Sequence, residues 1–226
     1  MSDDAAAELR IRVNHHIQFL KIAETFLSKG YVLPHAVVGE HFGFVPEFLP
    51  CGGMQDFVTE EMLKSMGMSF SVACDRAIAN MIAEMGDEAA WDRIGVEDGV
   101  PQFYVSNWSS VNHAAGIFNR SFANLPCKGT TILFPISKDK LIVTGSESAV
   151  GLAAVVAEWE QNPYLLPPFG LVYNDGVLSV WEPPITNLAY TSLQKHKNLY
   201  LNSLYGEQCN AMRANLPDAD LYFPAK

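Results

Sequence analysis

The chain has 226 residues, of which 49 % are apolar and 18 % charged, and its formal net charge is −10. This composition is typical of a globular protein with a sizeable core, and the length allows one large domain or two small ones. No segment approaches the roughly 18 unbroken apolar residues that a membrane-spanning helix needs. The acidic N-terminus "MSDDAAAELRIR" has no apolar stretch and is therefore not expected to be a secretory signal. We expect a cytoplasmic protein that does not associate with membranes.

The negative charge is concentrated in the first part of the chain. Residues 1–100 carry 16 acidic and 7 basic side chains, a net charge of −9, whereas residues 101–226 carry 9 acidic and 8 basic ones. An acidic surface repels nucleic acid phosphates, so we expect no nucleic acid partner. It is complementary to a basic protein partner, although the same charge also serves solubility alone.

Neither the cysteines nor the histidines predict a metal site. The four cysteines are far apart: Cys51, Cys74, Cys127 and Cys209. We expect free thiols in a reducing compartment, because a zinc site needs ligands at short spacing. His35 and His41 would lie roughly 20 Å apart on a continuous strand, and only a sharp bend at Gly39 would bring them together. The sequence therefore predicts no metal and no cofactor.

Helical spacing dominates the N-terminal segment. Its apolar stripe consists of Leu9, Val13, Ile17, Leu20 and Leu27. This stripe predicts a helix over about residues 5–29, which Gly30 is well placed to end. The next segment, "YVLPHAVVGEHFGFVPEF", predicts one or two strands with bends at the glycines, and a short strand follows that ends near Val58.

Two helices are predicted after Val58. Thr59 is a favourable N-cap, the acidic Glu60 and Glu61 stabilise the start of the helix, and Gly67 ends it. Ser69 is expected to cap the second helix. The apolar stripe of that helix consists of Phe70, Cys74, Ala77, Met81 and Met85. The polar stretch 86–99 predicts no regular element.

Strands and helices are mixed in the second half of the chain. "VPQFYVSN" predicts a strand, and the segment after it a helix that ends near Ala123. "GTTILFPIS" and "KLIVTGS" predict a hairpin that turns at Lys138–Asp139. "SAVGLAAVVAEWEQ" predicts a helix, "FGLVYNDGVLSVWEP" a second hairpin with an Asn-Asp-Gly turn, and the remainder one broken helix or two.

This order of elements predicts an α+β fold with a mixed or antiparallel sheet, packed helices and a C-terminal helical extension. We expect one domain over residues 1–226. Within it, residues 1–30 form the N-terminal helix, residues 31–185 the core and residues 186–226 the helical extension.

Several phrases in the chain resemble an uncharacterised bacterial family, the one catalogued as domain of unknown function 1444. "VTEEMLKSMGMSFSVACDRAIANM" is similar to its threonine-capped helix, turn and second helix. "GIFNRSFANL" and "TTILFPISKDKLIVTGSESAVGLAAVVAEW" are similar to its helix, hairpin and helix, and "NPYLLPPFGLVYNDGVL" to its closing turn and hairpin. The resemblance spans residues 30–182 and implies an architecture but no functional residues.

The segment "SNWSSVNHAAGIFN" contains candidate binding residues. Ser109 or Ser110 as a nucleophile with His113 as its base would need a third group to orient the histidine, and the first downstream carboxylate is Asp139. We therefore expect the serines to cap a helix and predict no catalytic residue. Three side chains near the expected helix start should point away from the core, where free N–H groups bind anions. These candidate binding residues are Trp108, Asn112 and His113.

The segment "TGSESAVG" has the strand–turn–helix context of a nucleophile elbow but not its sequence. Glu147 stands where that motif requires serine, and the lysine of a phosphate-binding loop is missing. We expect Ser146 or Ser148 to cap the helix that follows.

The leading functional hypothesis is a non-enzymatic binding or regulatory protein that engages a protein partner, for example as an immunity-type protein against a basic toxin. An acidic run is the candidate surface: Asp87, Glu88, Asp92, Glu97 and Asp98. The C-terminal helices either pack on their own domain or form a homodimer. The alternatives are a hydrolase that uses the Ser/His pair near residue 110, and a small-molecule or anion sensor.

Overall fold

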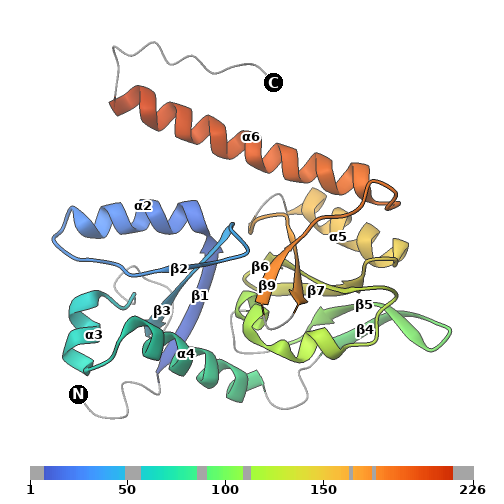
Figure 1. Cartoon of the computed structure of the whole chain (residues 1–226), viewed down its shortest axis with the longest axis horizontal. Helices are drawn as coiled ribbons and strands as arrows, with labels where there is room; N and C mark the ends of the chain where they lie inside the picture. The colour runs from blue at the N-terminus through green and yellow to red at the C-terminus, as the bar shows by residue number, and fades with distance from the viewer. Residues whose placement is uncertain are drawn as a thin grey trace.

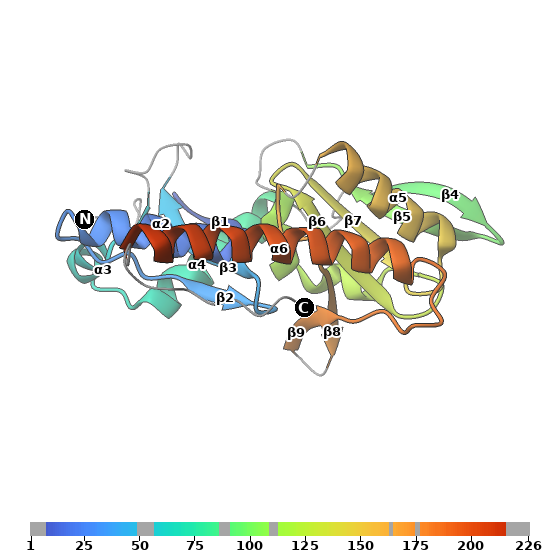
Figure 2. The same ribbon diagram turned by 90° about the horizontal axis from the view of Figure 1, so that it is seen from above.

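A computed structural model gives the fold. It describes residues 8–48, 57–85, 91–108, 113–162, 165–174 and 177–215, and within these ranges the side chains of residues 85, 113–115, 121 and 211–215 are left out. The chain has an α+β fold, as predicted, and all its strand pairs among the described residues are antiparallel. Two sheets lie side by side, and a long C-terminal helix crosses both of them (Figure 1, Figure 2).

The small sheet belongs to the N-terminal part of the chain. Its strands, in spatial order, are β1 (Leu9–His15), β3 (Phe42–Phe48) and β2 (Ala36–Val38). Its helices are α2 (His16–Leu27), α3 (Glu60–Met66) and α4 (Phe70–Met85). Phe19 of α2 is buried with Val45 of β3, and α4 packs against β1, so both faces of the sheet are covered.

The predicted N-terminal helix is wrong in its first half, which forms β1. Leu9 and Val13 are four residues apart, a spacing that a helix and a strand both place on one face. Ile11 distinguishes the two structures, because only a strand places it on the same face as Leu9 and Val13. All three side chains are buried in the core, as a strand requires. Helix α2 begins only at His16. The N-terminal segment is therefore part of the core and not a separate helix.

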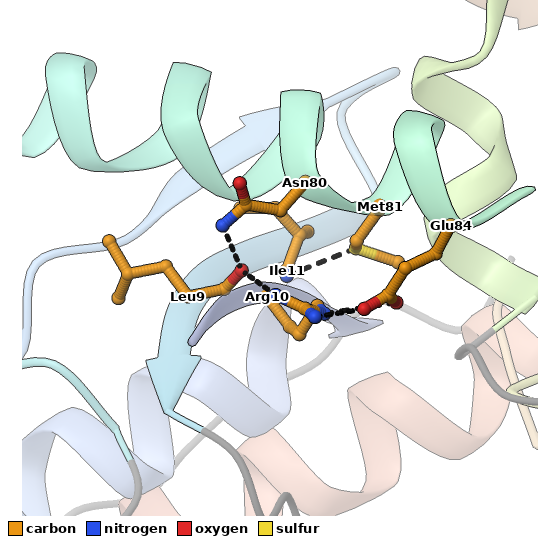
Figure 3. A network of polar contacts seen from close by, with 6 residues as sticks. All are labelled: Leu9, Arg10, Ile11, Asn80, Met81 and Glu84. Atoms are coloured by element: carbon orange, nitrogen blue, oxygen red, sulfur yellow. Dashed lines mark hydrogen bonds and ion pairs between the residues drawn. The ribbon is translucent and has the colours of Figure 1, made fainter. Parts of the chain in front are cut away.

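Side chains of α4 bind the backbone of β1 on the side away from β3. Asn80 Nδ2 donates to the Leu9 carbonyl at 3.0 Å, and the Ile11 N–H donates to Met81 Sδ at 3.2 Å (Figure 3). Arg10 forms an ion pair with Glu84. The outer edge of β1 is therefore closed by one helix, an arrangement that native sheets use against unwanted strand pairing.

The segment between α2 and α4 follows its prediction. The chain reverses between β2 and β3 at Gly39 and Glu40, which have φ values of 55° and 66°. Thr59 accepts a hydrogen bond from the Met62 N–H, and Gly67 ends α3 in the left-handed conformation. Phe57 forms a single β-bridge to Glu47 next to the expected short strand, most of which lies outside the described residues.

The large sheet has six strands from the second part of the chain. In spatial order they are β4 (Trp91–Glu97), β5 (Val100–Ser106), β7 (Lys140–Gly145), β6 (Thr131–Ser137), β8 (Gly170–Asn174) and β9 (Val177–Trp181). Both predicted hairpins are confirmed, β6–β7 with its turn at Lys138–Asp139 and β8–β9 with Asn174 opposite Val177. Asp175 and Gly176 of the second turn lie outside the described residues.

Two predictions for this part of the chain are wrong. The polar stretch 86–99 contains β4, a strand at the sheet edge whose two faces are mostly exposed, so that no buried face marks it in the sequence. The segment after β5 forms two 3₁₀ helices, η2 (His113–Phe118) and η3 (Arg120–Asn124), and not one α-helix. Such short turns place Ile117 and Phe122 in the core without a continuous apolar stripe.

The main core lies between the two sheets. It contains Leu9 and Ile11 of β1, Ala77 of α4, and Leu133 and Val143 of the large sheet. A second core fills the opposite face of the large sheet beneath α5 (Ala149–Gln161), around the buried Trp159. The main cluster contains residues of both sheets, so the two sheets share one core between them.

The C-terminal segment is one continuous helix, α6 (Tyr190–Asn215), and not the broken helix or helix pair that was predicted. Leu193, His196 and Tyr200 are buried on its inner face, at spacings of three and four residues. The extension therefore packs on its own chain.

Candidate functional site

The structure describes one of the three predicted binding residues fully. Trp108 follows β5 and is only 7 % exposed, and its ring packs edge-on against Trp91 with 5.2 Å between the ring centroids. A Cβ at Gly116 would lie 2.4 Å from Trp108 Cη2, so this glycine is needed for the ring to fit. The expectation that Trp108 points away from the core is therefore wrong: the 3₁₀ geometry of η2 replaces the assumed α-helix and closes over the ring.

The other residues of that segment are not all described. His113 begins η2, but its side chain is left out, and Ser109, Ser110 and Asn112 lie outside the described residues. The proposed Ser/His pair and the two remaining candidate binding residues stay predictions.

The strand–turn–helix segment at α5 uses its serines for structure. Ser148 Oγ accepts a hydrogen bond from the Gly151 N–H at 3.1 Å and donates to the Gln102 carbonyl at 2.8 Å. Ser146 Oγ accepts from the Thr130 N–H at 2.9 Å. Ser148 is therefore the predicted N-cap, and both hydroxyls bind backbone groups in place of a catalytic base.

A cleft of about 470 Å³ lies next to this turn. Its walls come from the start of α5, the end of β7 and the segment between β9 and α6, which Asn187 fixes by donating to the Ser146 carbonyl at 2.7 Å. Glu147 is the only charged side chain in the lining, and no histidine or cysteine joins it. The cleft has the size of a small-molecule site but lacks the nucleophile and base of a hydrolase.

The structure separates the two histidines that were considered as metal ligands. The chain does turn at Gly39, but His35 lies beside His16, with 5.6 Å between the ring centroids, whereas His41 stacks on Phe169 at 3.9 Å. Over the described part of the chain, no three histidine, cysteine or acidic side chains are grouped so that they could hold a metal ion.

Strand β4 is the most accessible element of the sheets. Among the described residues it pairs with β5 alone, so one side of its backbone presents N–H and C=O groups outward. All its residues after Trp91 are exposed. Figure 2 shows the β4–β5 hairpin projecting beyond α5, at the end of the molecule opposite to α2 and α3.

The side chains of this hairpin combine aliphatic and acidic groups. Ile94 lies opposite Phe103, and Val96 opposite Pro101, with exposed fractions of 39 % for Ile94 and 63 % for Val96. Residues 91–106 contain three carboxylates and one guanidinium. These charged residues are Asp92, Arg93, Glu97 and Asp98. We call β4 with its connecting turn at residues 98–99 the acidic edge.

Two hydrogen bonds hold carboxylates of the acidic edge in place. Gln102 Nε2 donates to Glu97 Oε2 at 2.6 Å, and Asn107 Nδ2 donates to Asp92 Oδ1 at 3.1 Å. Both donors are neutral amides, so they orient the carboxylates without neutralising them. The negative charge is therefore available to an approaching cation.

A turn signal in the sequence marks this hairpin. Asp98 and Gly99 both have positive φ values, 51° and 79°, as the two central residues of a type I′ turn require. Asp-Gly is a preferred pair for that turn, and Glu97 and Val100 flank it as the last strand pair. The strand itself is hard to recognise in the sequence. Its charged residues interrupt the alternation of apolar and polar positions that predicts strands.

The remaining edge strands offer less free backbone. β2 has three residues, and the β2–β3 turn lies against β8 and β9: a Cβ at Gly39 would be 2.7 Å from Leu171 Cδ2 and 3.3 Å from Val180 Cγ2. Asn80 and Met81 bind the outer edge of β1. β9, the other edge of the large sheet, has five residues, so the seven-residue β4 is the longest edge strand without such cover in the described part of the fold.

Comparison with known protein families, with curated proteins and with solved structures gives no match for this chain. None of the described helices combines the length and hydrophobicity needed to cross a lipid bilayer.

Proposed function

We propose that this chain is a non-enzymatic binding or regulatory protein of the cytoplasm that engages a basic protein partner through the acidic edge. One observation carries the proposal: β4 presents a free backbone edge, exposed aliphatic side chains and carboxylates on the same strand. An immunity-type protein that neutralises a basic toxin is one concrete form of this function. We also propose membership of the family catalogued as domain of unknown function 1444, a resemblance that implies no activity.

The chemistry of the edge defines the partner. A free edge pairs with an extended segment through main-chain hydrogen bonds, and alternate side chains determine which segment fits. Ile94 and Val96 favour apolar residues opposite them, and Asp92 and Glu97, which lie on either side of this pair along the strand, favour lysine or arginine. The expected partner segment is therefore a strand with aliphatic residues in the middle and basic residues towards both ends. Its binding should weaken with salt, because exposed charges are screened.

A homodimer through the C-terminal helix is less well supported. The buried residues of α6 face its own chain, and Leu199 and Tyr205 are the large apolar side chains that its described part leaves exposed for such a dimer. Self-association through β4 remains one outcome of the binding test, and light scattering of the purified protein detects it.

A small-molecule sensor is the second candidate, supported by the 470 Å³ cleft beside α5. It predicts that a ligand raises the melting temperature, because a ligand that binds only the folded state stabilises it. The hydrolase alternative has less support, since the two described serines near the cleft bind backbone groups.

The test is an affinity purification from native lysate with three forms of the full chain. The first is wild type, and the second carries Ile94→Lys and Val96→Lys, which cancel the net negative charge of the edge and block strand pairing. The third is a matched control, Val150→Lys and Leu165→Lys, at exposed apolar positions elsewhere (54 % and 57 % exposed) with the same change in charge.

We expect wild type and the control to retain a basic protein that the β4 variant loses, at low and moderate salt. Loss of that protein from both variants would show that net charge alone drives the binding. Retention by all three forms, or no partner at any salt concentration, would contradict the proposal.

A further inference from the structure

Helix α6 joins the two sheets across the top of the molecule (Figure 1, Figure 2). Near its start Leu193 packs into the core beneath α5, and farther along Tyr200 packs into the core between the sheets. Beyond Tyr200, Glu207 forms an ion pair with Lys21 of α2. One helix therefore binds both the large-sheet side and the small-sheet side of the fold.

Tyr200 sits in a socket of aromatic and imidazole rings. Its hydroxyl is hydrogen-bonded to His15 Nδ1 at 3.1 Å, and its ring meets Phe169 and His41 edge-on at 5.8 and 6.4 Å. His41 stacks flat on Phe169, with 3.9 Å between the ring centroids and 5° between the planes. We call these three residues around Tyr200 (His15, His41 and Phe169) the Tyr200 socket.

The surroundings of His41 disfavour its charged form. Burial lowers its pKa most, Lys197 of α6 and His16 of α2 lower it further, and Glu40 and Glu182 raise it. Lys197 already lies over the Phe169 ring at 5.5 Å and pairs with Glu182. A cation–π contact between a protonated His41 and Phe169 would therefore compete with an existing cation and would not offset the cost of burial.

One turn before Tyr200, α6 carries a second buried histidine. His196 is buried against α5, with its ring 5.7 Å from that of Trp159. Burial lowers its pKa, nearby Lys195 also lowers it, and Glu160 of α5 raises it. Tyr200 takes no part in titration at neutral or acidic pH, because burial and Glu207 raise its pKa to about 12.

We propose that α6 is an acid-sensitive clasp: protonation of His41 in the Tyr200 socket and of His196 beneath α5 releases the helix from the two sheets and uncovers the apolar surface below it. In the closed state both rings are neutral and packed. In the open state both reach water, where the imidazolium is solvated and the ring contacts are lost.

The direction of the pH effect follows from proton binding. A histidine whose pKa is lowered in the closed state binds fewer protons there than in the open state. Well above pH 6.5 both states are neutral, so pH does not change the equilibrium. As pH falls below about 6.5 the open state takes up protons first, and each histidine makes opening up to tenfold more favourable per pH unit until the closed state is protonated as well.

Amide hydrogen exchange of the full chain at pH 7.5 and 5.5 tests the clasp, with rates corrected for the intrinsic pH dependence of exchange. We expect faster corrected exchange in residues 198–210 at the lower pH and unchanged protection in β6 and β7. His41→Phe keeps the stack on Phe169 but cannot titrate, so its α6 should respond less to pH. His35→Phe is the control, because His35 contacts His16 and Phe19 and should leave the response intact.

Equal corrected exchange in α6 at both pH values would overturn the proposal. So would loss of protection in β6 and β7 together with α6, since this would be global unfolding. If His41→Phe does not fold, proton NMR of wild type replaces it: the Tyr200 ring signals should shift with the midpoint of His41. Tyr200 signals that stay constant through that titration would also overturn the clasp.

Discussion

Strands β1 and β4 are both seven-residue strands at the edge of a sheet, yet the fold treats them in opposite ways. Side chains of α4 bind the outer backbone of β1, and alternate β1 residues are buried. No described element binds the outer backbone of β4, and its residues after Trp91 are exposed. The outer backbone of β1 is bound within the fold and contributes to its stability, whereas the open and charged edge of β4 is available to a partner.

The largest difference is expected between two isoleucines. Ile11→Ala in β1 removes a fully buried side chain and should lower the free energy of unfolding by about 2–5 kcal/mol. Ile94→Ala in β4 removes a side chain that is already 39 % exposed and leaves no buried cavity, so it should cost about 1 kcal/mol or less. Chemical denaturation of both variants measures the difference. Equal losses would mean that β4 is as much a part of the core as β1.

Removing one side chain that closes the β1 edge should have an intermediate effect. Asn80→Ala deletes the hydrogen bond to the Leu9 carbonyl and should cost about 1 kcal/mol, the usual net value of such a bond. Asn107→Ala next to β5, which deletes the bond to the exposed Asp92 of β4, is the matched change and should cost less. A greater loss for Asn107→Ala would reverse the assignment of the closed and the open edge.

The smallest effect is expected for the ion pair between Arg10 and Glu84. The side chain of Arg10 is 12 % exposed and that of Glu84 32 %, so the pair lies at the surface, and a double-mutant cycle with Arg10→Met and Glu84→Gln should give a coupling of about 0.5 kcal/mol. High salt should reduce this coupling, because screening shortens the range of exposed charges. A coupling that stays constant with salt would indicate a pair shielded from water.

Much of the fold could be predicted because local signals agree with the final packing. Thr59 and Gly67 act as helix caps wherever the segment packs, and the β6–β7 hairpin has a short polar turn between two apolar runs. The N-terminal segment was mispredicted because Leu9 and Val13 fit both a helix and a strand, and the pairing of β1 with β3 decides between them. Such pairing is not encoded locally.

The candidate site could be predicted only in part. The acidic run was recognisable from composition, but its place on an open strand edge depends on which strands pair with β5. The burial of Trp108 depends on Gly116 and on Trp91, which are separated in sequence and brought together by the fold. The four histidines near α2 and the β2–β3 hairpin carry no motif, and α6 supplies the contacts that make His15 and His41 part of one socket.

Site-specific photo-crosslinking tests the central claim most directly. A benzophenone amino acid replaces Ile94 in β4 in one form of the chain and Ile82 in α4 in the other, two positions with the same exposed fraction of 39 %. We predict that irradiation in native lysate attaches a basic protein at position 94 and not at position 82. No adduct at position 94, or the same adduct at both positions, would contradict the claim that the open edge of β4 is the surface that binds a partner.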